Sequence, residues 1–204
     1  MHNWLYRYSN DYVAASWSKT QRAQNVDIIA SFLYSKGWTI DAIAAFCGNV
    51  EYESYMNPGQ WQHGFSVGSA NAGYGLVQWT PRTKYSDWAG ADWNSDYDLE
   101  LYRIDYELQA DIASPNSLQW IARAPYNLSF YQFTQATAAQ YGIAWLSDCF
   151  FYSYERGTAG LYDREQNADY WLTYLRSHPP QPWEPVEEKS KFKIMFYLKP
   201  WWKR

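Results

Sequence analysis

The sequence is poor in several features that define common protein classes. It contains 2 cysteines, Cys47 and Cys149, in 204 residues, too few for a disulfide framework. Both lie in apolar stretches that predict buried free thiols. The 3 histidines are scattered, and no CxxC, HExxH, P-loop or GxGxxG pattern occurs. The sequence therefore predicts no metal, nucleotide or other cofactor.

Charge and long apolar runs are also scarce. Charged residues make up 19% of the chain and the net charge is −4, which disfavours binding to the phosphates of a nucleic acid. The strongly apolar run at residues 194–198 is far shorter than the roughly 20 residues that span a membrane. The first ten residues lack the apolar centre of a secretory signal. We therefore expect no transmembrane segment, and assembly in the cytoplasm of the producing cell.

Aromatic side chains, by contrast, are in excess. They make up 21% of the residues, with 13 Trp and 20 Tyr against 9 Phe. Trp and Tyr combine an apolar ring with a polar group, and they are over-used where a ring meets a wet partner. A groove that stacks rings on sugars is one such use.

A change of composition divides the chain into two predicted parts. Residues 179–204 hold 6 Lys/Arg and 3 Asp/Glu, whereas residues 1–178 hold 11 and 18. The change coincides with a proline-rich run, HPPQPWEP, at 178–185. We predict a catalytic domain at 1–178, followed at 179–204 by a linker and a basic aromatic tail. Residues 186–204 are expected to dock onto another protein, and contact with an anionic surface is the weaker alternative.

The domain is predicted to be mainly helical. Ser18 and Gln21 form a capping-box pattern that opens a helix closed by Gly37. Thr39 is placed to cap a second helix, which is predicted to run to Asn57. Helical spacing returns in three later segments, at 99–108, 136–152 and 162–177.

A glycine-rich stretch interrupts this helical pattern at residues 60–80. The strand-like run YGLVQWT at 74–80 ends it, and we predict a small β-hairpin or three-stranded flap there. The expected fold class is therefore α+β: mainly helices with one β insertion after the second helix.

Two carboxylates in the second helix are candidates for chemistry. Glu51 and Glu53 lie about 200° apart around a helix, so they cannot face the same groove. Glu53 continues the apolar stripe and sits at the helix C-terminus, where desolvation and the helix dipole disfavour a negative charge. A general acid needs such surroundings to hold a proton near neutral pH. A solvated glutamate at a helix end is the simpler alternative.

At this point the sequence resembles the phage tail lysozyme family, lysozyme-like domains of tail-tip proteins that open bacterial peptidoglycan. The resemblance rests on GNVEYESYMNPGQWQ (48–62) and GYGLVQWTPR (73–82), together with SKGWT (35–39), SYER (153–156) and an R-x-Q-x-A-x-YW segment (164–171). It spans roughly residues 20–177 and implies a lysozyme-like fold.

The resemblance also implies roles for individual residues. The family's catalytic glutamate precedes the serine of an ES dipeptide, which is Glu53 here. Gly75 and Gln78 match a G-L-x-Q element that forms a groove wall facing the acid. Trp79 is a candidate ring for stacking on a sugar, and Tyr154 belongs to a motif near the catalytic helix. These four are the candidate substrate-binding residues.

A second carboxylate, which glycoside hydrolysis usually requires, is not identified by the pattern. No Asp or Glu occurs between Glu53 and Asp87, so the predicted flap carries none. Asp87, Asp92 and Glu155 are candidates, and nothing in their spacing selects one. A single-acid mechanism, in which the 6-hydroxyl of the substrate attacks, is the alternative.

The resemblance thus implies a muramidase that cleaves the MurNAc–GlcNAc backbone of peptidoglycan from the virion tail. The basic tail of the chain is expected to contact phage tail proteins. Three alternatives stay open: a lytic transglycosylase giving 1,6-anhydro products, an endolysin, and a sugar-binding tail module without catalysis.

Overall fold

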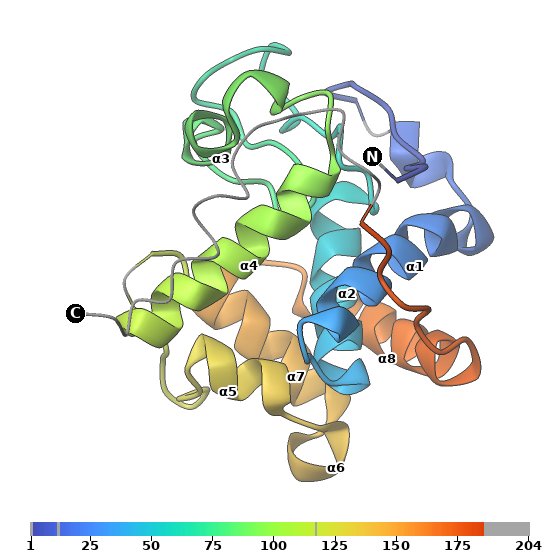
Figure 1. Cartoon of the computed structure of the whole chain (residues 1–204), viewed down its shortest axis with the longest axis vertical. Helices are drawn as coiled ribbons and strands as arrows, with labels where there is room; N and C mark the ends of the chain where they lie inside the picture. The colour runs from blue at the N-terminus through green and yellow to red at the C-terminus, as the bar shows by residue number, and fades with distance from the viewer. Residues whose placement is uncertain (1, 12, 117, 186–204) are drawn as a thin grey trace.

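The structure, a computed structural model, describes residues 2–11, 13–116 and 118–185. Helices dominate this part of the chain (Figure 1). The helices of the fold are α1 (Lys19–Ser35), α2 (Ile40–Ser54), α3 (Thr83–Ala89), α4 (Asp98–Ala113), α5 (Phe130–Gln135), α6 (Ala138–Tyr141), α7 (Ile143–Phe150) and α8 (Leu161–Ser177). Short 3-10 helices, η1 (Val13–Ser16) and η2 (Gly90–Asp92), and a π-helix, η3 (Phe151–Glu155), complete them. None of the described helices is both long and apolar enough to cross a membrane.

The predicted helix starts are confirmed. The Ser18 side chain accepts a hydrogen bond from the main-chain N–H of Gln21, and the Gln21 side chain completes the capping box. The Thr39 side chain caps α2 by accepting a hydrogen bond from the main-chain N–H of Ala42. The end of α2 differs from the prediction, because Tyr55 and Met56 take left-handed φ values of 54° and 63°. The helix therefore stops at Ser54.

Helix α2 runs through the centre of the fold and packs against α1, α7 and α8 (Figure 1). Its contact with α8 is close because Gly48 lies at the crossing. A methyl group on Gly48 would come within 2.6 Å of the Arg164 carbonyl oxygen and 2.7 Å of the Ala168 Cβ. The absence of a side chain at this position lets the two backbones approach.

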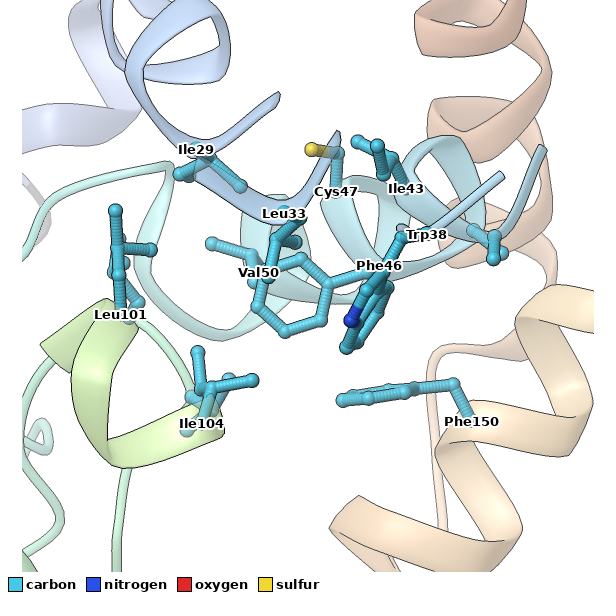
Figure 2. Close-up of a cluster of buried hydrophobic side chains, with 14 of the residues drawn as sticks. Ile29, Leu33, Trp38, Ile43, Phe46, Cys47, Val50, Leu101, Ile104 and Phe150 are labelled. Carbon is cyan, nitrogen blue, oxygen red and sulfur yellow. The ribbon is translucent and has the colours of Figure 1, made fainter. Parts of the chain in front are cut away.

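The hydrophobic core is built largely from rings. Figure 2 shows Phe46 of α2 and Trp38 of the preceding loop facing Phe150 of α7. Trp38 meets the Phe46 ring edge-on at 5.9 Å, a favoured aromatic geometry. Most of the tryptophans that the structure describes are buried: Trp4, Trp17, Trp38, Trp61, Trp79, Trp120 and Trp171. Many of the aromatic side chains that are in excess in the sequence therefore pack in the hydrophobic core. The two cysteines are buried and free, as predicted.

The predicted β-hairpin does not form as strands. In residues 57–82 the structure has isolated bridges, Trp61 with Tyr74 and Tyr74 with Trp79, in place of a ladder. Gly75 at φ 83° and Gln78 at φ 50° turn the chain between Tyr74 and Trp79. Extended pairing cannot continue through left-handed residues. Within the described residues the domain is thus mainly helical, with a looped insertion.

The segment after α8 returns to the domain. The Trp183 ring stacks on His2 at 3.9 Å and meets Phe32 of α1 at 5.0 Å. The first residues of the predicted linker therefore pack against the core. The predicted tail, residues 186–204, lies outside the described residues, and the boundary after residue 178 stays a prediction.

Gly48→Ala tests the α2–α8 crossing. Overpacking at this contact is expected to lower the free energy of unfolding by about 1–3 kcal/mol. Helix propensity alone predicts the opposite, a gain of about 1 kcal/mol for alanine over glycine. The sign of the change in melting temperature decides between the two, and an increase would contradict the close crossing.

Candidate active site

Glu53 lies in the last turn of α2, and its carboxylate forms an ion pair with Arg164 of α8. The Glu53 side chain is 21% exposed, whereas that of Arg164 is 2% exposed. One side of the Glu53 carboxylate is therefore accessible to solvent, and the other side contacts the buried Arg164 guanidinium group. The expected apolar surroundings are replaced on that side by a guanidinium group.

Arg164 is held rigidly by groups other than Glu53. One guanidinium nitrogen, Nη1, donates to the Asn49 side-chain oxygen at 3.0 Å. The guanidinium group also lies over the rings of Tyr52 and Phe151, at 4.3 Å and 4.7 Å from their centroids. Such cation–π contacts fix its plane. Since Arg164 is fixed, the direction in which Glu53 points is fixed as well.

Glu51 occupies different surroundings, as the helical separation predicts. It is 3% exposed and forms ion pairs with Lys19, at 2.7 Å, and with Arg22. The Trp171 indole donates to its Oε2 at 2.6 Å. A buried carboxylate with two cations and an indole donor ties α1, α2 and α8 together. The oxygens of Glu51 therefore accept hydrogen bonds that stabilise the fold.

Of the three candidates for a second acid, Glu155 is brought to Glu53. It ends η3, and its Oε1 is buried without a hydrogen-bond partner among the described residues. Burial raises the pKa of Glu155 well above its ordinary value; the nearby Glu53 charge raises it further, and Arg164 opposes this. Asp87 and Asp92 are exposed, on α3 and η2.

Gly75 and Gln78 shape the loop that follows α2. A side chain on Gly75 would come within 2.8 Å of the carboxylate of Glu100, a buried residue of α4. The Gln78 amide donates to the carbonyl oxygens of Gln60, at 3.0 Å, and Gly75, at 2.9 Å. Both residues therefore have clear roles in holding the loop. Their predicted contact with substrate stays a prediction.

Trp79 and Tyr154 are placed in the core, contrary to the prediction of surface contacts with sugar. They are 2% and 1% exposed. Both donate to buried Glu107 of α4: the Trp79 indole at 3.2 Å and the Tyr154 hydroxyl to the other oxygen. Trp79 also stacks on Tyr85 at 4.9 Å. Because both side chains are buried, their rings have no free face for a pyranose.

Sequence reasoning missed this row of carboxylates on α4. Glu100, Glu107 and Asp111 are all buried. Glu100 accepts the main-chain N–H of Leu76 at 2.7 Å, and Asp111 accepts that of Phe130 at 2.9 Å. Burial raises the pKa values of Glu100 and Glu107 above the ordinary range. Their spacing, i, i+7 and i+11, places all three on one face of a helix and was the available signal.

The site thus consists of a glutamate at a helix end above a buried arginine, in a domain that is mainly helical where the structure describes it. The sequence model described as phage tail lysozyme matches residues 24–175. The chain belongs to the phage tail lysozyme family. It is also similar to Morphogenesis protein 1 of Bacillus phage B103, at 35% identity over 161 residues. The match covers 78% of this chain and 41% of that protein, so the chain spans less than half of this relative's length.

Glu51→Gln is expected to destabilise the fold, whereas Glu53→Gln is expected to do so less. Removing the Glu51 charge leaves the buried Arg22 uncompensated, a change that typically costs about 3–5 kcal/mol in a buried pair. Glu53 is more exposed, and a glutamine there can still accept from Arg164. Thermal and urea unfolding of the two variants provide the comparison. Equal losses of stability would show that Glu51 is not the structural partner described.

Proposed function

We propose that this protein is a virion-associated muramidase that cleaves the MurNAc–GlcNAc backbone of peptidoglycan, with Glu53 as the general acid. Membership of the phage tail lysozyme family supports the substrate class. The observation that carries the proposal is the Glu53 carboxylate, half-buried at a helix end and oriented by buried Arg164. A general acid must be both reachable by substrate and fixed in direction.

In the proposed reaction Glu53 donates its proton to the glycosidic oxygen as the bond from MurNAc C1 to that oxygen breaks. Positive charge then develops on the sugar ring, and a second carboxylate stabilises it or activates the attacking water. Glu155 suits this role because it is close enough for its charge to interact with Glu53. Its unpartnered Oε1 leaves it an oxygen that is not committed to structure.

The two carboxyl groups and Arg164 form one electrostatic unit. Burial and the Glu53 charge both raise the pKa of Glu155, and Arg164 opposes them. Ionised Glu155 places a second negative charge beside Glu53 and the single guanidinium group, which is unfavourable in a buried place. We therefore propose that Glu155 ionises at higher pH than an exposed glutamate does, and that this ionisation shapes the alkaline side of the activity profile.

Glu53→Gln is expected to lower the rate of muropeptide release from purified peptidoglycan by about 10²–10⁴-fold, the usual contribution of a general acid. Mass spectrometry of the products gives the reaction type. Reducing MurNAc ends are expected, whereas 1,6-anhydro ends would establish a transglycosylase in its place. Wild-type protein that releases no muropeptides, or a Glu53→Gln variant with unchanged rate, would refute the proposed role.

Glu155→Gln is expected to remove one inflection from the alkaline side of the activity profile. A glutamine cannot ionise, so the substitution removes the titration of Glu155, whose pKa is raised by burial and by the Glu53 charge. Rates of muropeptide release measured across pH test this. Asp163→Asn is the control, because Asp163 is an exposed acid in the first turn of α8. A Glu155→Gln profile with the wild-type shape, at any activity, would assign Glu155 a purely structural role.

A further inference from the structure

A hollow lies away from Glu53, between α1, α8 and the N-terminal segment. Its volume is about 760 Å³, and its lining includes Asn3, Gln24, Asp27, Tyr170 and Tyr174. Figure 1 shows α1 and α8 on the same side of the molecule. This hollow, here called the α1–α8 groove, has the volume of an ordinary small-molecule site.

The groove is separate from the candidate active site. Arg164, beneath Glu53, and Tyr174 are ten residues apart on α8, which corresponds to about 15 Å along a helix. The lining contains neither Glu53 nor Glu155. A ligand in the groove therefore leaves the Glu53 side open.

One wall of the groove presents aromatic rings. Tyr170 is 43% exposed, which sets it apart from the buried tryptophans of the core. Tyr174 stacks on His178 with ring centroids 4.4 Å apart and an angle of 14° between the planes. The Lys19 ammonium lies over one face of the Tyr170 ring, 4.6 Å from its centroid, and the exposed remainder of the ring gives the otherwise polar hollow an apolar surface. Such a surface suits the C–H faces of a sugar ring.

The opposite wall presents hydrogen-bonding groups. Asp27 and Gln24 project from α1 into the lining, and Asn3 adds a further amide. The Tyr174 hydroxyl donates to the Asp27 carboxylate at 3.1 Å and 3.3 Å. This contact fixes Asp27 while leaving lone pairs for other donors. Rings on one side with amide and carboxylate groups on the other are the chemistry that recognises hydroxyl-rich ligands.

We propose that the α1–α8 groove binds carbohydrate, namely a segment of a glycan strand remote from the bond being cleaved. The choice of peptidoglycan as the source of that glycan rests on the proposed function. A phosphate-rich ligand is disfavoured, because Asp27 faces the hollow and the chain carries a net charge of −4. A site of this kind holds the enzyme on a polymer between cleavage events. Its loss therefore affects polymeric substrate and spares short fragments.

Co-sedimentation with purified peptidoglycan sacculi tests the groove, using full-length Glu53→Gln protein so that the polymer is not degraded. In that background Tyr170→Ala is expected to weaken binding by about tenfold, equivalent to about 1.4 kcal/mol. Asp27→Asn is a second variant, since the asparagine oxygen can still accept from Tyr174. Tyr131→Ala is the matched control, because Tyr131 is 52% exposed on α5, outside the groove. Melting temperatures check that each variant is folded.

The outcomes separate this proposal from the proposed function. Weaker binding by the Tyr170 and Asp27 variants, with Tyr131→Ala unchanged, supports the groove. With Glu53 restored, Tyr170→Ala should cleave short soluble glycan fragments at the wild-type rate. Sacculus binding unchanged in both groove variants overturns the groove proposal even if wild-type protein releases muropeptides. Conversely, groove-dependent binding without muropeptide release upholds the groove and refutes the muramidase.

Discussion

The pairing of charge at the end of α2 is the constraint on which the rest of the domain depends. This helix places Glu51 among buried side chains and Glu53 above a buried guanidinium group. The buried Glu51 needs its partner charges, since an unpaired buried ion is strongly destabilising, whereas the more exposed Glu53 supplies a charge to buried Arg164. Lys19 and Arg22 come from α1, and Arg164 comes from α8. The three helices therefore stabilise one another, and the candidate acid acquires its orientation from the same packing.

The sequence predicted those features that depend on residues close to one another along the chain, namely the helix starts and the helical faces. The side chains of Ser18 and Thr39 cap α1 and α2 as their positions indicate. The turn of 100° per residue separated Glu51 from Glu53 correctly, but it did not reveal that Glu51 is buried and paired with Lys19 and Arg22. The family was also identified from its motifs. For the helix starts and the helical faces, the controlling interactions lie within a few residues along the chain.

The glycine-rich loop was harder to predict because its partners are remote in sequence. The alternating pattern YGLVQWT favours a strand, but the main chain there bonds to the side chain of Glu100, which lies on α4. Trp79 and Tyr154 were expected from the motifs to contact substrate, yet both are buried and donate hydrogen bonds to Glu107. Buried acids on a helix have no local signature apart from their spacing. The α1–α8 groove depends on residues from both ends of the domain, and no single motif marks it.

The carboxylates of α4 have a consequence for how this domain tolerates sequence drift. Glu100 and Asp111 bind main-chain N–H groups of Leu76 and Phe130, and every amino acid except proline supplies that group. Where a loop is anchored through its backbone, its side chains are free to change without loss of the anchor. The loop that contains Leu76 and the segment that enters α5 at Phe130 can therefore accept side-chain changes without losing their attachment to α4.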